Sequence, residues 1–214
     1  MINKIELKNI CKEFKNYKVL DNVNISFEKD KIYGLIGRNG SGKSVLIKII
    51  SGLISPTSGE LLINGEVYNG KIPNNLGILF DEIGMLDNLS AFDNLKLLAS
   101  IKNKINDNEI RNFLELVGLD GHDKRKFKNY SLGMKQKVGI ANALMENPNL
   151  ILLDEPMNGL DEESVHHFRK ILSSLKKDRI IIITSHNKED ISILCDDVYK
   201  VNEGLVLNNK FQKN

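Results

Sequence analysis

The chain has 214 residues, enough for one globular domain with its own core. Its 41% hydrophobic and 27% charged residues exclude a collagen, a coiled coil and a disordered chain. Thirty Lys and Arg residues against 28 Asp and Glu give a net charge of +2, too small a surplus to indicate nucleic-acid binding. Aliphatic runs such as Ile180–Ile183 are far shorter than the roughly 20 residues that cross a bilayer, so we expect no membrane span.

Three smaller features concern the compartment and the surface. Cys11 and Cys195 lie far apart, and neither has a metal-ligand partner at the usual spacing, which favours a reduced cytosolic protein. The first residues alternate between apolar and polar, which predicts a strand and not a signal peptide. The basic cluster Lys124–Lys128 is interpreted as a solvated surface and not as a patch for nucleic acid or lipid.

The first part of the chain reads as strands followed by a helix. Alternation predicts two strands, over Ile2–Ile10 and Val19–Phe27, joined by the polar stretch Lys12–Lys18. The apolar run Ile32–Ile36 does not alternate, which is typical of a strand buried on both faces of a parallel sheet. A glycine-rich turn follows, and helical spacing then predicts a helix over Ser44–Gly52.

The rest of the chain predicts an α/β protein with an insertion. Strands are predicted over Leu61–Val67, with a hairpin turn at Asn64–Gly65, and over Leu76–Phe80. From Leu89 to Met145 apolar residues recur at helical spacing, which indicates an inserted helical subdomain. The elements predicted after it are a strand at Leu150–Leu153, a crossover helix at Val165–Leu175, a strand at Ile180–Thr184 and strands within Val198–Leu207.

Residues 37–44 read Gly-Arg-Asn-Gly-Ser-Gly-Lys-Ser and fit the phosphate-binding loop (P-loop) pattern in full. They stand between a buried strand and a helix, a context that a plain glycine turn would not explain. The glycines let backbone N–H groups turn toward phosphate oxygens, and the helix adds its positive end. In such a loop Lys43 reaches the β- and γ-phosphates and the Ser44 hydroxyl binds Mg²⁺.

Two carboxylates follow the buried strand Leu150–Leu153. A nucleotide hydrolase needs one carboxylate to hold the metal and another to orient the attacking water. Asp154 is the candidate for the metal, and Glu155 is the candidate general base. Alone, this pattern would equally fit a salt-bridged strand end, but beside a phosphate loop it indicates hydrolysis.

His186 follows the next buried strand. Because active groups gather where parallel strands end, we expect Lys43, Asp154, Glu155 and His186 to converge. His186 could then contact the γ-phosphate. A lone histidine is more often a structural residue, so this role depends on its neighbours.

In order and spacing these motifs resemble those of the ATP-binding cassette (ABC) ATPases, the nucleotide-binding subunits of ABC transporters. The resemblance covers essentially the whole chain. Residues 130–136, Tyr-Ser-Leu-Gly-Met-Lys-Gln, are similar to the ABC signature in the form found in drug-resistance and bacteriocin-immunity exporters. Residues 158–161, Asn-Gly-Leu-Asp, resemble the D-loop, and His186 is similar to the switch histidine.

The resemblance implies an α/β fold: a P-loop ATPase core with a mostly parallel sheet, an N-terminal antiparallel β-subdomain and an inserted α-helical subdomain. Residues 1–214 would form a single ABC ATPase domain. The ATP-binding core with the β-subdomain would take residues 1–83 and 146–214. The helical subdomain with the signature motif would take residues 84–145.

The resemblance also implies that two cassettes pack head to tail and that no single chain holds a complete site. Each ATP lies between the P-loop of one cassette and the signature of the other, where Ser131 and Gly133 would contact the γ-phosphate.

Phe14 stands where the family has an aromatic residue that stacks on adenine. Tyr17 is an alternative for this contact, and a structural role in the core is an equally good interpretation of Phe14. The residues implied are, for catalysis, Lys43, Glu155 and His186; for ATP, Phe14, Gly37, Arg38, Asn39, Gly40, Ser41, Gly42, Lys43, Ser44, Val45, Ser131, Gly133 and Asp161; and for Mg²⁺, Ser44, Asp81 and Asp154.

Three positions depart from the family pattern. Val45 replaces the usual second Thr or Ser, so only its backbone N–H remains for the α-phosphate. Asp81 stands where Gln or Glu is usual, and its shorter side chain would reach the metal through water. Leu132 replaces the first signature glycine, as in the exporter branch named above.

The function implied is that of an ATP-hydrolysing subunit that drives a separately encoded transmembrane permease. Such a subunit uses ATP and Mg²⁺, lies in the cytoplasm at the inner face of the cell membrane and binds no nucleic acid. It pairs with a second ABC ATPase subunit, either another copy of this chain, which is favoured, or a paralogue. The signature form favours an exporter of an antimicrobial peptide or antibiotic. One alternative is a soluble ABC ATPase acting on ribosomes or DNA, and the other is a degenerate cassette that binds ATP only as a scaffold.

Overall fold

A six-stranded sheet runs through the computed structural model, which describes residues 1–15, 17–68, 72–80 and 83–209. In spatial order the sheet contains β10 (Leu205–Asn209), β9 (Asp197–Asn202), β3 (Lys31–Ile36), β8 (Ile180–Ser185), β7 (Leu150–Leu153) and β6 (Leu76–Leu79). Strands β9 to β6 are parallel, and β10 is antiparallel to β9. Every residue of β7 and β8 is buried because both faces of the sheet are covered, which explains their unbroken aliphatic sequences.

A second, antiparallel sheet covers one side of the fold. Its spatial order is β2 (Tyr17–Glu28), β1 (Lys4–Phe14), β4 (Ser58–Ile63) and β5 (Glu66–Val67). The stretch predicted as a polar connection is therefore mostly strand, because Glu13 pairs with Lys18 across the ladder and Phe14 with Tyr17. Opposite charges on facing strand positions favour this pairing over a loop.

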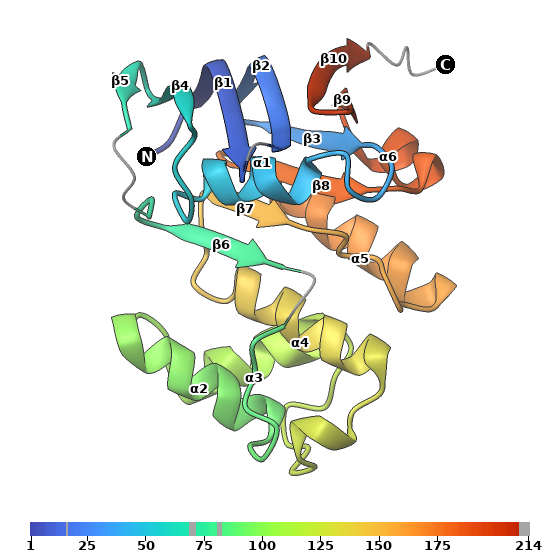
Figure 1. Ribbon diagram of the computed structural model, residues 1–214. Coiled ribbons are helices and arrows are strands. Elements are labelled where there is room, and N and C mark those ends of the chain that lie inside the picture. Colours follow the sequence, from blue (N-terminus) through green and yellow to red (C-terminus); the bar gives the residue numbers. More distant parts are fainter. Residues whose placement is uncertain (16, 69–71, 81–82, 210–214) are drawn as a thin grey trace.

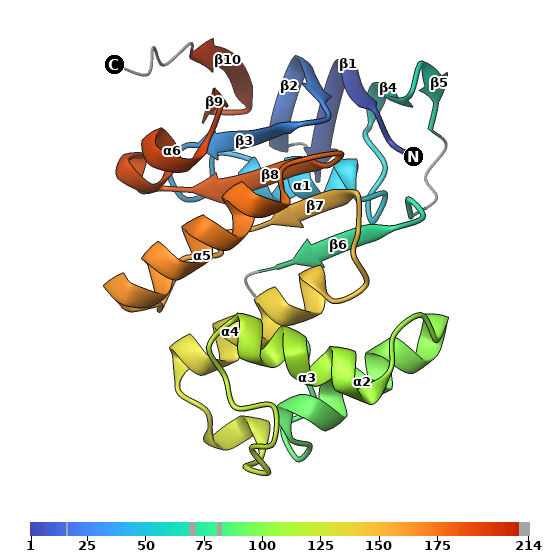
Figure 2. The same cartoon turned by 180° about the vertical axis from the view of Figure 1, so that it is seen from behind.

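Helix α1 (Lys43–Ile50) lies between the two sheets (Figures 1 and 2). Its buried Leu46, Ile47, Ile49 and Ile50 share one core with β1, β2 and one face of the central sheet. This packing fixes the start of α1, which is where the glycine-rich loop ends.

The other face of the central sheet packs against the remaining helices, which share a second core. They are α2 (Ala91–Lys102), α3 (Asp107–Leu116), the 3-10 helix η1 (Phe127–Asn129), α4 (Leu132–Leu144), α5 (Glu162–Leu175) and α6 (Lys188–Leu194). Figure 1 shows α2, α3 and α4 grouped beyond the β6 edge of the sheet, with α4 the helix that reaches it. In the described part of the chain, no helix is both long and apolar enough to span a bilayer.

The contact between β6 and α4 leaves no room for a side chain at Gly77. A Cβ atom there would lie 1.9 Å from the carbonyl oxygen of Ala143 in α4 and 2.6 Å from Pro148 Cγ. Because the first of these is a backbone atom, Gly77→Ala must push β6 and α4 apart. We expect it to lower the free energy of unfolding by about 2–3 kcal/mol, measured by denaturant titration.

Gly84→Ala is the matched control. No atom of the described residues lies within 4 Å of a Cβ placed at Gly84, so this variant should keep the stability of the parent protein. Equal stability of the two variants would show that the close approach of β6 and α4 is not needed.

Candidate active site

A cavity of about 380 Å³ opens at the carboxyl ends of β3, β7 and β8. It is lined by the loop Asn39–Val45 and by Asp154, Glu155, Asn158 and His186. The ends of three strands, at Ile36, Leu153 and Ser185, therefore contribute to one hollow although they lie far apart in the sequence. This is the edge at which parallel α/β sheets bind their ligands.

The loop before α1 has the geometry of an anion cradle. Gly42, the residue that precedes the helix, has φ +109°, a conformation that residues with a side chain rarely adopt. The first N–H groups of α1 have no partners inside the helix and lie at its positive end. Among the described residues, the buried hydroxyl of Ser41 has no hydrogen-bond partner, so it can donate to an anion that enters the cavity.

Lys43 is the cation of this cavity, and only 6% of its side chain is exposed. Its Nζ donates hydrogen bonds to the carbonyl oxygens of Gly37, at 2.8 Å, and Arg38, at 3.3 Å. The same Nζ lies 3.4 Å from Glu155 Oε1. The Lys43 side chain thus folds back over its own loop, and its positive charge partly neutralises the negative charge of the Glu155 carboxylate.

Asp154 is held by a neighbour that the sequence analysis did not single out. Its Oδ1 accepts a hydrogen bond of 2.6 Å from the buried hydroxyl of Thr184. Leu153 and Ile183 are paired in the parallel register, so the two following side chains lie side by side. The hydroxyl of Thr184 thus offsets part of the cost of burying this carboxylate.

Glu155 lies between two basic side chains. Its Oε2 is 2.9 Å from His186 Nδ1, while its Oε1 faces Lys43 without the geometry of a hydrogen bond. Its backbone is left-handed, with φ +48°, and its N–H donates to Thr184 Oγ1 at 2.8 Å. A carboxylate in these surroundings can accept a proton from a molecule placed in the cavity.

The two predicted signature residues and the last D-loop residue lie outside this cavity. Ser131 is exposed and caps α4, accepting a 3.2 Å hydrogen bond from the Met134 N–H. Asp161 caps α5 in the same way, through the Ser164 N–H at 2.8 Å. That hydrogen bond, more than any other contact, lowers the pKa of the Asp161 carboxyl below its usual value.

The aromatic candidates lie at the tip of the β1–β2 hairpin. Phe14 and Tyr17 are both exposed and neither lines the cavity, although Val19, two residues beyond Tyr17, does. The ammonium of Lys12 makes a cation–π contact with the Phe14 ring, at 4.9 Å from the ring centroid. Asp81, the third metal candidate, lies outside the described residues.

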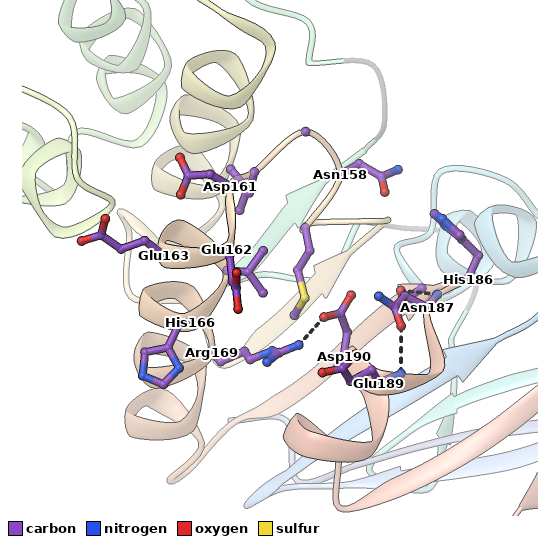
Figure 3. Close-up of a pocket in the computed structure, with 15 residues that line it drawn as sticks. Asn158, Asp161, Glu162, Glu163, His166, Arg169, His186, Asn187, Glu189 and Asp190 are labelled. Carbon is purple, nitrogen blue, oxygen red and sulfur yellow. Dashed lines mark hydrogen bonds and ion pairs between the residues drawn. The ribbon is translucent and has the colours of Figure 1, made fainter.

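A larger groove of about 1000 Å³ adjoins the cavity along α5 and the start of α6 (Figure 3). Asn158 and His186 line both hollows. The groove carries the carboxylates of Asp161, Glu162, Glu163, Glu189 and Asp190, and an ion pair between Arg169 and Asp190 joins the two helices. This negative lining repels phosphate, so the smaller cavity is the candidate site for a nucleotide.

The cavity presents oxygen ligands that suit a hard cation bound together with a phosphate-containing molecule. In the part of the chain that the structure describes, no three His, Cys, Asp or Glu side chains gather as a metal cage. The Ser44 hydroxyl and the Asp154 carboxylate both line the cavity and are oxygen donors. Mg²⁺ is usually bound in this way, by one or two protein oxygens together with substrate phosphates.

Comparison with known proteins identifies the family. Residues 20–158 match the family described as "ABC transporter". The uncharacterised ABC transporter ATP-binding protein YybJ of Bacillus subtilis is 45% identical over 94% of this chain and 93% of its own length. The lantibiotic transport ATP-binding protein SrtF of Streptococcus pyogenes is 37% identical over 95% of this chain and 89% of its own length.

A solved structure confirms the predicted fold class. The bacterial ABC transporter cassette MJ0796, described as dimeric, superposes with a TM-score of 0.86 at 24% identity. The match covers 97% of this chain and 99% of that one. The family match and the two relatives confirm the resemblance inferred from the motifs. The chain belongs to the ABC transporter family, as an ATP-binding subunit that hydrolyses ATP.

Proposed function

We propose that this subunit powers the export of an antimicrobial peptide through a separate membrane permease, with ATP bound in the 380 Å³ cavity. The convergence of Lys43, Asp154, Glu155 and His186 on a phosphate loop carries the catalytic part of the proposal. The cargo class is supported by SrtF, a lantibiotic transport subunit that aligns with nearly the whole chain, and by the Leu132 form of the signature.

ATP binding would use groups that the cavity already presents. Backbone N–H groups of residues 37–45 would surround the phosphates, and the unpartnered Ser41 hydroxyl would donate to one of their oxygens. Lys43 would exchange the carbonyls of Gly37 and Arg38 for the β- and γ-phosphates. Phe14, or else Tyr17, would stack on adenine at the mouth of the site.

Mg²⁺ would be held by Ser44 and Asp154, with Asp81 as a further ligand. When bound, the ion neutralises charge on the transferred phosphoryl group. The Thr184 hydroxyl keeps the Asp154 carboxylate at the cavity wall by donating to Oδ1, and no hydrogen bond from the described residues occupies the second oxygen, which would bind the ion.

Hydrolysis would depend on Glu155 as the general base. Its carboxylate would accept a proton from the attacking water, and His186 Nδ1 would keep that carboxylate oriented toward the cavity. The positive charge of Lys43 would stabilise the same ionised carboxylate until phosphate takes its place.

A second copy of the chain would complete each site. Ser131 and Gly133, at the start of α4, and Asp161, at the start of α5, lie outside the cavity of their own chain and would contact ATP held by the partner. The helical subdomain, residues 84–145, would dock on the permease. The subunit would then work in the cytoplasm at the inner face of the membrane, as the peripheral part of the transporter.

Removing the proposed base should separate binding from hydrolysis. We expect Glu155→Gln to lower kcat by about 100-fold or more, because an amide cannot take the proton, while ATP affinity is retained. The ATP-bound protein should accumulate as a dimer, measured by light scattering after gel filtration. Glu163→Gln makes the same exchange on the exposed first turn of α5 and should leave kcat at the parent value. A Glu155→Gln protein that turns over at the parent rate would refute the assignment of the base.

Lys43→Ala should act on binding instead. The variant deletes a charge-assisted contact to phosphate, so we expect the Kd for ATP to rise about 10- to 100-fold in calorimetric titration. Lys48→Ala, in the last turn of the same helix, removes an equal charge away from the cavity and should keep the parent Kd. Equal ATP affinities of the two variants would contradict the proposed phosphate contact.

The transporter assignment can be tested by its partner. Tagged Glu155→Gln protein, incubated with solubilised membranes of the source organism, ATP and Mg²⁺, should recover a protein with several membrane spans. Lys43→Ala is the control and should recover less of it. Cells that lack this permease should become more sensitive to a lantibiotic. Recovery of ribosomes or DNA-bound proteins without a permease would contradict the transport function.

A further inference from the structure

Gln136 is a buried polar side chain on α4 that reaches out of its own helix. Only 5% of the residue is exposed. Its Nε2 donates to the carbonyl oxygens of Glu155, at 3.2 Å, and Pro156, at 3.1 Å. These two carbonyls belong to the turn that follows Asp154. We call α4 the signature helix because it begins at the signature residues. One side chain of this helix therefore holds the backbone of the turn that contains the proposed base, Glu155.

The backbone that Gln136 holds is in an unfavourable conformation. Glu155 has φ +48°, the left-handed region, which costs free energy for a residue with a Cβ atom and persists only where the surroundings impose it. Its N–H is fixed by Thr184 Oγ1 at 2.8 Å. Its carbonyl is fixed by Gln136 and by the N–H of Asn158 at 3.2 Å. Of these three partners, only Gln136 comes from the helical subdomain.

The first residues of α4 also contact Gly159, at the far end of the segment that begins at Glu155. A Cβ atom at Gly133 would lie 2.7 Å from the carbonyl oxygen of Gly159, and one at Gly159 would lie 2.8 Å from Leu132 Cγ. The segment Glu155–Gly159 is thus held by α4 at both ends, through Gln136 and through the Leu132–Gly133 turn. A displacement of α4 cannot leave the Glu155 peptide where it is.

We propose that Gln136 is a positioning residue that couples the signature helix to the base of the same chain. It keeps the left-handed Glu155 peptide oriented so that its carboxylate lies between Lys43 and His186. This inference rests on the proposed function, in which the start of α4 contacts ATP bound by the second copy. Gln136 then links occupancy of the partner's site to the position of Glu155 in its own.

Two substitutions remove the donor while keeping the volume. In Gln136→Met the two carbonyls lose their donor. In Gln136→Glu, assayed at a pH high enough to ionise the new carboxyl group, a carboxylate faces them. We expect kcat to fall about 10- to 100-fold in both, with KM and the Kd for ATP unchanged, because the phosphate cradle is untouched. Asn142→Met is the control: it places the same side chain on the same helix, beside the hollow between α2 and β6, and should keep the parent kcat. Thermal unfolding midpoints show which variants are folded, and Gln136→Met retains the test if the buried charge prevents folding of Gln136→Glu.

A double-mutant cycle with Glu155→Gln distinguishes positioning from a general loss of structure. If Gln136 acts through Glu155, adding Gln136→Met to Glu155→Gln should leave the residual turnover unchanged. An equal further fall in that background, or a folded Gln136→Met protein with parent kcat, would overturn the proposal. The failure of the proposed function would look different, because Glu155→Gln alone would then turn over at the parent rate.

Discussion

The parallel register of β3, β8 and β7 determines where the reactive groups of this chain lie. Ile36 pairs with Ser185, and Leu153 pairs with Ile183, so the three strands end at nearly the same level. A slip of one residue would turn buried aliphatic side chains to the wrong face, and burial on both faces makes this costly. The phosphate loop, the two carboxylates and the histidine therefore leave the sheet together.

That convergence places the largely buried side chains of Lys43, Asp154 and Glu155 at one edge of the sheet, and the structure offsets their charges in two ways. The hydroxyl of Thr184 donates to the carboxylate of Asp154 and accepts from the N–H of Glu155, so one neutral group holds both. The Glu155 carboxylate is flanked by Lys43 and His186. Within the described residues, the ammonium of Lys43 contacts two carbonyl oxygens and one carboxylate oxygen, which are contacts that a phosphate group can displace.

Local patterns were sufficient for most of the strands, for the glycine-rich turn before α1 and for the edge of the sheet at which they meet. Each of these depends on residues close together in sequence, and the aliphatic run of β8 predicts its burial directly. The roles of Thr184 and Gln136 could not be predicted in this way, since both act on backbone atoms of a turn formed elsewhere in the chain. For Thr184 a signal existed, because aligning the ends of the two aliphatic runs places it beside Asp154. Gln136 carries no such signal: its partners are carbonyl groups, which every residue has.

The position of Gln136 bears on how a shared site can be regulated. A buried amide on a helix is destabilising unless its partners are fixed, and here they are fixed only while α4 and the turn after Asp154 keep their relative placement. The same helix begins at Ser131, on a surface that its own cavity does not use. If that surface meets the nucleotide of a second copy, the geometry of the base in one chain depends on what the other chain has bound. Hydrolysis would then follow assembly, because Gln136, one of the three groups that hold the left-handed Glu155 peptide, belongs to the helix whose start would meet the second copy.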